Sequence, residues 1–344
     1  MTLLSVRSQL THGFVSCVSS VRVLTSMSST ATEVVFIRHG VTEMNEWLGQ
    51  PGKGWGSPNF VDPGLWDTRL TTRGVSQALR LRAALEAHGK VREAASINGG
   101  GAVGSVEGGS VLVNDLTGLD TTSVRLICAS PLTRALETAC LGLGLCEPED
   151  IRGLAAEEKD KGFLANIFRA AGGAGGDSSD KNSGAVLSFD GGKRPRLVTS
   201  PLCAERLYLS SDVGRSAREL AETFSKTAGF DFEADLGRSR DGWWYRESGD
   251  GGEVEWRPPG DYCCPGEPLD AFEGRLAAFK TWLAEETARD CPPASPPTSH
   301  ATSLVVVVAH WGVIHALTGQ SLDNCGVVRI SLGDLLCMPL YRHE

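Results

Sequence analysis

The chain has 344 residues, of which 41% are hydrophobic, and it carries 33 basic against 42 acidic residues for a formal net charge of -9. This length and apolar content support a sizeable globular core, whereas the negative charge removes the general electrostatic attraction that nucleic-acid-binding proteins show. No apolar run reaches the roughly 20 residues that a membrane-spanning helix needs. We therefore expect a soluble protein without a membrane span or a nucleic-acid partner, in which any anion site is local.

The first 30 residues contain no Asp or Glu, carry Arg7 and Arg22, and are rich in Ser, Thr and Val. This composition is typical of an organellar transit peptide. A disordered extension, with Met27 as the true start, explains it equally well. The expected location is intracellular: cytoplasmic, or organellar if residues 1–30 are a transit peptide.

Three continuous runs rich in β-branched residues predict buried strands: Glu33–Ile37, Val124–Ala129 and Leu304–Ala309. Each run ends at charged residues, Ser-Pro or His-Trp-Gly, as a strand does when it reaches a loop. Apolar runs without alternation suit the central strands of a sheet that helices cover on both faces. We expect a mostly parallel sheet.

Helices are predicted between these strands. Ser130 is a plausible N-cap with proline at the first helical position, and Ser216 with Glu219 forms a capping-box pattern. The expected helices cover the following ranges: Thr72–His88, Pro131–Leu145, Ser216–Lys226 and the amphipathic segment Pro268–Ala288. Alternating strands and helices predict an α/β fold, a three-layer α/β/α sandwich.

Three stretches near residues 98–122, 172–192 and 291–303 are rich in Gly or Pro. Such compositions bury too little apolar surface to offset the entropy of ordering them. We expect flexible insertions, so that residues 31–344 form a single domain.

The residues that are candidates for catalysis or binding directly follow the predicted strands. Arg38-His39, Arg134 and His310 each come just after one of them, and ligands of open α/β sheets bind beyond the carboxyl ends of the strands. In a chain of net charge -9, four convergent cationic or potentially cationic groups indicate an anion site. Arginine grips phosphate oxygens through two parallel hydrogen bonds, and a neutral imidazole attacks phosphorus directly. Phosphoryl transfer explains each residue type.

The sequence also resembles a known family, the histidine phosphatase superfamily, often called phosphoglycerate-mutase-like. Four stretches carry the resemblance, in this order: Arg38–Gly40 with Thr42 and Asn45, Asp67–Gly74 with Gln77 and Ala78, Ser130–Ala135 with Glu137–Ala139, and Val308–Ile314. The resemblance spans roughly Glu33 to Gly319. It implies a phosphoglycerate-mutase-like α/β/α fold.

By this resemblance His39 is the phosphate acceptor, and Arg38, Arg134 and His310 hold the phosphoryl oxygens. Thr42 and Asn45 would contact the substrate, Asn45 as a neutral donor. Capping of a loop is the alternative role for Asn45.

The family also uses an acid that protonates the leaving oxygen and then activates water, a role suited to a carboxyl group with a raised pKa. Glu205 resembles that residue, because its segment is similar to the acid-bearing loop of the phosphatase branch. Glu219 and Glu222 lie nearby and are the alternatives. Val41 and Trp311 depart from residues common in the family, and both changes are expected to reshape the mouth of the pocket.

Other patterns in the sequence give little support for a metal site or a cofactor site. The ten cysteines lack metal-ligand spacing, and Cys263-Cys264 is not a C-x-x-C motif, so reduced thiols are expected. His310 and His315 are five apart and do not stack on a helix as zinc ligands would. Gly99–Gly104 formally matches the dinucleotide fingerprint, but no strand precedes it and no helix follows. We predict no metal site and no cofactor. The cluster Trp243–Tyr245 suits either a substrate lid or plugs that anchor a long loop.

The function expected first is hydrolysis of a small phosphorylated substrate through a phosphohistidine on His39, with Glu205 as proton donor. A phosphoglycerate mutase is the second hypothesis, although the extended mutase motif after the acid fails: Glu205-Arg206 is followed by Leu-Tyr-Leu. A non-catalytic phosphate-binding scaffold is the third. The sequence indicates neither the particular ester nor the oligomeric state.

Overall fold

The computed structural model describes residues 32–54, 57–58, 60–98, 121–151, 194–237, 243–244, 266–290 and 303–342. The N-terminal 30 residues, most of the three expected insertions, the glycine run at 99–104 and the cysteine pair at 263–264 lie outside these ranges. Within the described ranges, no helix has both the length and the apolar character to cross a membrane.

A five-stranded sheet lies at the centre of the molecule, in the order β3-β2-β4-β1-β5. Its strands are β1 (Thr32–Arg38), β2 (Val124–Ala129), β3 (Arg196–Thr199), β4 (Ser303–Ala309) and β5 (Val327–Ser331). The first four are parallel, whereas β5 pairs antiparallel with β1 at one edge. The expected mostly parallel sheet is confirmed.

The three predicted strands are the three central ones, β2, β4 and β1. The two edge strands were not predicted. β3 has only four residues, half of them partly exposed, and all but the first residue of β5 are partly exposed. Edge strands lack the continuous apolar run that burial on both faces requires.

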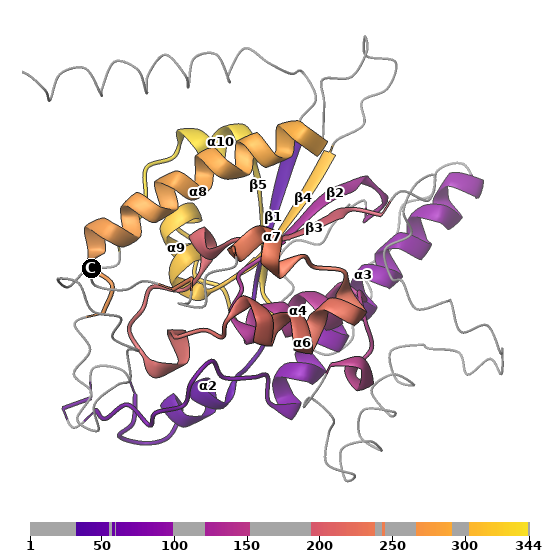
Figure 1. Ribbon diagram of the computed structural model, residues 1–344. Coiled ribbons are helices and arrows are strands. Elements are labelled where there is room, and N and C mark those ends of the chain that lie inside the picture. Colours follow the sequence, from indigo (N-terminus) through magenta and orange to yellow (C-terminus); the bar gives the residue numbers. More distant parts are fainter. Residues whose placement is uncertain are drawn as a thin grey trace, which may run out of the picture.

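Helices cover both faces of the sheet (Figure 1). One layer contains α3 (Thr72–Asn98), α4 (Thr133–Gly142), α6 (Ala217–Ala228) and α7 (Phe232–Leu236). The other layer contains α8 (Leu269–Asp290), α9 (Trp311–Thr318) and α10 (Leu332–Cys337). Alternate residues of β1 enter the two cores, since Val35 packs toward the first layer and Phe36 toward the second. The three-layer α/β/α sandwich is confirmed.

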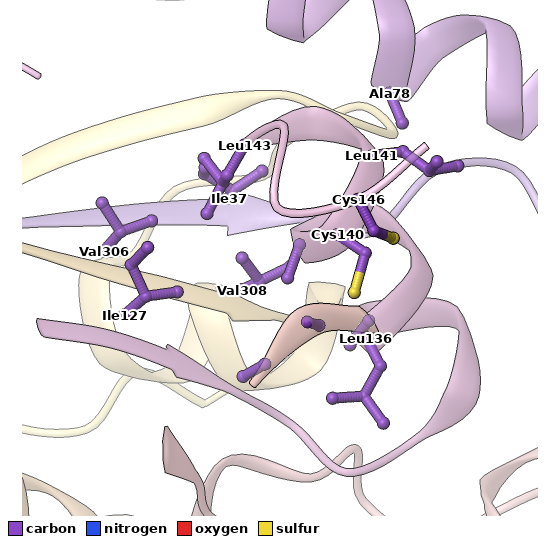
Figure 2. Close-up of a cluster of buried hydrophobic side chains, with 14 of the residues drawn as sticks. Ile37, Ala78, Ile127, Leu136, Cys140, Leu141, Leu143, Cys146, Val306 and Val308 are labelled. Atoms are coloured by element: carbon purple, nitrogen blue, oxygen red, sulfur yellow. The ribbon is translucent and has the colours of Figure 1, made fainter. Parts of the chain in front are cut away.

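Figure 2 shows part of the first core, where strand residues such as Ile37, Ile127 and Val308 face Leu136 and Cys140 of α4. Burying a large apolar side chain of this kind stabilises the fold by roughly 1.5–3 kcal/mol. Among the described residues, six cysteines are free.

Two helices, α4 and α3, differ most from the prediction. The α4 helix begins two residues later than expected, at Thr133, and its N-cap is Leu132 rather than Ser130. The Ser130 hydroxyl lies instead against a histidine of the site, which the local sequence does not reveal. The α3 helix continues ten residues beyond His88, through Gly89, because the residues that follow include the good helix formers Lys90, Arg92, Glu93 and Ala94. The capping box of Ser216 and Glu219 is confirmed.

Candidate active site

A cavity of about 490 Å³ opens at the carboxyl ends of the parallel strands. Arg38 is the last residue of β1 and His39 follows it, and Arg134 lies in the first turn of α4 after β2. Both arginines, His39 and Glu205 line this cavity, as do Thr42 and Asn45. The fold therefore brings six of the predicted residues from separate segments to one cavity.

His39 is buried at the base of the cavity, and only 5% of its surface is exposed. Its Nδ1 lies 2.8 Å from the carbonyl oxygen of Gly40. A carbonyl oxygen only accepts, so Nδ1 carries the proton and donates it, which leaves a lone pair on Nε2 of the neutral ring. The main-chain oxygen of His39 accepts from Asn324 Nδ2 at 2.9 Å, and its N–H donates to Ala309. These contacts fix the orientation of the imidazole.

The charge around His39 favours the neutral ring. Burial lowers the pKa of His39 well below its usual value, and the guanidinium groups of Arg134 and Arg38 lower it further. At neutral pH the ring therefore keeps the Nε2 lone pair that a nucleophile needs.

His310 lies directly behind His39, with ring centroids 5.2 Å apart at an interplanar angle of 54°. Its Nε2 is 2.7 Å from the hydroxyl of Ser130, and burial lowers its pKa well below the usual value. The ring is fully buried and is not part of the cavity wall. The structure thus brings His310 to the site, but one layer deeper than the other predicted residues.

The two arginines are held by oxygen atoms of distant segments. Arg134 donates through one terminal nitrogen to the carbonyl of Ser211 at 2.6 Å, and through the other to Asp212 Oδ1 at 2.8 Å. Arg38 donates to the carbonyl of Leu322 at 2.6 Å. Its Nε atom is buried and has no hydrogen-bond partner in the described part of the chain. That donor is the kind of group that an anion in the cavity satisfies.

Glu205 approaches the cavity from the loop that follows β3. Its Oε1 accepts from the backbone N–H of Arg206 at 3.0 Å, and its Oε2 accepts from that of Gly312 at 3.1 Å. Burial raises the pKa of this carboxyl, and the charge of Asp212 raises it further. Glu205 therefore holds a proton more tightly than an exposed glutamate does.

The alternative acids lie elsewhere. Glu219 and Glu222 are exposed on α6 and do not line the cavity. Glu219 completes the capping box with Ser216, and Glu222 pairs with Arg218 at 3.2 Å. Both glutamates have structural partners away from the site.

Thr42 and Asn45 form the capping box of the short helix α2 (Glu43–Leu48). The Thr42 hydroxyl accepts from Asn45 N at 3.2 Å, and Asn45 Oδ1 accepts from Thr42 N at 3.1 Å and from Asn324 at 3.4 Å. The capping role considered for Asn45 is thus real. Since its Oδ1 is occupied, its amide nitrogen is the group available to a ligand.

The other motif residues support the His39 loop rather than line the cavity. The N–H of Gly40 donates to Thr138 at 3.0 Å, and that of Val41 donates to Gln77 at 2.9 Å. A side chain at Gly40 would come within 2.8 Å of the Gly74 carbonyl. The glycines of both motifs therefore allow the two backbones to touch.

A second support is built around Asp67, whose backbone has a φ of 36°. Its carboxylate accepts from Thr133 N and Arg215 Nε at 2.8 and 2.9 Å. This arrangement ties the start of α4, and with it Arg134, to the second motif. Sequence reasoning missed the roles of Ser130 and Asp212; the signal for Asp212 was its place in the segment that carries Glu205.

The mouth of the cavity contains Trp311, which stacks on His315 with a centroid distance of 5.2 Å and an angle of 15°. Trp311 thus lines the cavity, whereas Val41, for which the same effect was expected, does not. Trp243 donates from its indole nitrogen to the carbonyl of Arg215 at 2.8 Å, and its ring covers Gly214. These contacts suit a plug that anchors a loop. Among the described residues, no group of three or more His, Cys, Asp or Glu is placed to hold a metal ion.

Comparison with known proteins finds similar chains among solved structures. No family model matches the sequence, and no curated protein matches it. A phosphoglycerate mutase from Bacillus anthracis is 16% identical with a TM-score of 0.35, covering 88% of this chain and 89% of that one. A phosphoglycerate mutase from Thermus thermophilus is 17% identical with a TM-score of 0.30, covering 87% and 92%.

A mycobacterial glucosyl-3-phosphoglycerate phosphatase is 16% identical with a TM-score of 0.32, covering 87% of this chain and 89% of that chain.

Proposed function

We propose that this protein is a phosphomonoester hydrolase that works through a phosphohistidine on His39. The observation that carries the proposal is the hydrogen bond from His39 Nδ1 to Gly40, which leaves the Nε2 lone pair in a cavity lined by Arg38 and Arg134. An imidazole that only bound phosphate would be useful as a cation, whereas this environment keeps it neutral. That contrast favours a nucleophile over a non-catalytic binding protein.

In the first step, the Nε2 lone pair of His39 attacks phosphorus and the P–O bond to the alcohol breaks. Protonated Glu205 gives its proton to the leaving oxygen, so the alcohol departs neutral. Arg38 and Arg134 hold the equatorial oxygens, where negative charge is spread in the transition state. Asn45 adds a neutral donor through its amide nitrogen.

In the second step, the Glu205 carboxylate takes a proton from water as the water oxygen attacks phosphorus. The P–N bond breaks, inorganic phosphate leaves, and both His39 and protonated Glu205 are restored. The ring of His310 is fully buried and its Nε2 contacts the Ser130 hydroxyl. To bind a phosphoryl oxygen, Nε2 must turn away from that hydroxyl toward the cavity.

The test is incubation with 4-nitrophenyl phosphate, followed by an alkaline quench that preserves phosphohistidine. The parent protein is expected to release phosphate and to carry one acid-labile phosphoryl group, and His39→Ala is expected to do neither. His315→Ala, which removes another imidazole of the cavity wall, must still take up the phosphoryl group. Activity that survives His39→Ala overturns the proposal.

Mutase activity is tested separately with 3-phosphoglycerate. We expect free phosphate as the product. Formation of the 2-phospho isomer at a comparable or higher rate would mean that the phosphohistidine returns its phosphoryl group to the substrate rather than to water.

A further inference from the structure

The cavity is much larger than a phosphoryl group requires, and its outer part has a distinct chemistry. We infer that the leaving alcohol of the substrate carries a flat, apolar ring system. The inference rests on the proposed function and names the class of ester that this site would hydrolyse. Four features of the outer cavity support it.

The first feature is a fixed aromatic wall. Trp311 directly follows His310 and begins α9, so its indole lies on the segment adjoining the reacting centre. It stacks on His315, and its indole nitrogen donates to Ser321 Oγ at 2.9 Å. Both contacts hold the ring in one orientation, so a ligand ring meets a pre-organised surface. The indole nitrogen therefore already has a hydrogen-bond partner, and the side chain lines the cavity.

The second feature is a stacked wall at the start of α8. The guanidinium of Arg206 lies 4.5 Å over the ring of Tyr208 and 6.0 Å over that of Phe272. Its Nε donates to the carbonyl of Glu267 at 2.7 Å, which holds the guanidinium over these rings. All three side chains line the cavity. Planar guanidinium groups and aromatic rings stack on other flat, apolar groups.

The third feature is exposed apolar surface at the rim. Of the described residues, four large hydrophobic side chains are exposed, and two of these, Leu269 and Tyr341, line the cavity at 39% exposure each. Exposed apolar side chains that gather at a concave site mark a place where a ligand covers them. Isolated surface hydrophobics, such as Val61, carry no such meaning.

The fourth feature is the pairing of charge at the rim. Arg342 donates through Nε and Nη2 to the two carboxylate oxygens of Glu273, at 2.7 and 2.9 Å. This bidentate pair occupies Arg342, one of the two arginines of the outer cavity, and the other, Arg206, already donates to Glu267 and stacks on Tyr208. A compact, highly charged ester such as phosphoglycerate therefore matches the outer cavity less well than an aromatic one.

The test compares four esters at saturating and limiting concentrations: benzyl phosphate, 2-naphthylmethyl phosphate, glycerol 3-phosphate and 3-phosphoglycerate. Benzyl and naphthylmethyl alcohols have similar acidity, so their difference reports on the outer cavity and not on the leaving group. We expect kcat/KM to rise at least tenfold from glycerol 3-phosphate to the naphthylmethyl ester, mainly through KM.

Two variants locate the effect. Leu269→Ser and Tyr341→Ser are expected to lower kcat/KM for the naphthylmethyl ester at least threefold each, and to leave that for glycerol 3-phosphate within twofold. Val61→Ser, the matched control, removes an exposed hydrophobic side chain that does not line the cavity. It is expected to change neither value.

The inference is overturned if glycerol 3-phosphate or 3-phosphoglycerate is hydrolysed as efficiently as the naphthylmethyl ester, or if both variants affect all esters equally. Failure of the proposed function looks different, because then no ester would produce a phosphohistidine. Calorimetry with 2-naphthylmethylphosphonate and methylphosphonate measures binding to the outer cavity alone, because neither compound has an ester bond that the protein could hydrolyse. Equal affinity for the two phosphonates also contradicts the inference.

Discussion

The backbone N–H of Gly312 donates a 3.1 Å hydrogen bond to Oε2 of Glu205, and this contact joins the loop after β3 to the first turn of α9. Gly312 approaches so closely that a Cβ atom there would lie 2.5 Å from Oε1 of the same carboxyl. The glycine after Trp311 therefore sets the position of the candidate acid.

Gly312→Ala is expected to displace Glu205 and to lower kcat for alkyl phosphates by roughly a hundredfold, because proton transfer from a positioned acid needs hydrogen-bond reach and contributes roughly a hundredfold or more. Stability should change little. The measurement is steady-state hydrolysis of benzyl phosphate, with Gly333→Ala as a control, since a Cβ at that helical position meets only Ser331 Oγ at 3.8 Å. Full activity of Gly312→Ala would mean that Glu205 is not the acid.

Glu205→Gln should slow esters of poor leaving groups far more than those of good ones. An alkoxide needs a proton to depart, whereas 4-nitrophenolate does not, so the expected loss is roughly a hundredfold for benzyl phosphate and much smaller for phosphohistidine formation from 4-nitrophenyl phosphate. Rapid-quench measurement of the first turnover separates the two steps. The matched control is Glu222→Gln, which changes an exposed glutamate of α6. Equal losses with both esters would point to another acid.

Asp212→Asn is expected to shift the pH profile as well as to lower activity. The charge of Asp212 raises the pKa of Glu205, so its removal lowers that pKa. The acid acts while protonated and activity falls as pH rises through its pKa, which means that the alkaline limb of kcat should move to lower pH. A profile that keeps its position while kcat falls would indicate that Asp212 acts only through Arg134.

The same substitution also breaks a buried ion pair, because the side chains of Arg134 and Asp212 are 5% and 6% exposed. Leaving the guanidinium without its charged partner is expected to reduce the free energy of unfolding by roughly 3 kcal/mol. Urea denaturation of the parent and the variant measures this loss. Binding of vanadate or phosphate should recover part of the lost free energy of unfolding, since the anion restores a partner for Arg134.

Gly74→Ala should destabilise the fold by roughly 1–3 kcal/mol or more, because the new Cβ would collide with the carbonyl oxygen of Val41 beside the His39 loop. Gly274→Ala is the matched control: its Cβ meets nothing within 4 Å on α8, and better helix propensity should stabilise by up to about 1 kcal/mol. Chemical denaturation distinguishes the two. A Gly74→Ala protein as stable as the parent would show that the two loops separate without cost.

Much of this protein follows from local sequence. The central strands, the capping box of Ser216 and the amphipathic helix α8 appear near their predicted positions, because apolar periodicity and capping residues act within a few residues of chain. The same logic failed for β3 and β5, whose half-buried residues carry no clear pattern. It failed also for Ser130, which has the residue type of an N-cap but whose hydroxyl lies 2.7 Å from Nε2 of His310, 180 residues away.

The sequence by itself determined which residue types stand where the strands end, namely Arg38, His39 and Arg134. Only the tertiary structure decided which partners and which charges surround them. The partner of Arg134 is 78 residues away, that of Arg38 is 284 away, and the amide that holds Glu205 is 107 away. Such distances along the chain leave no local pattern, and the protonation state of His39 depends on burial and on charges that only the folded chain brings together.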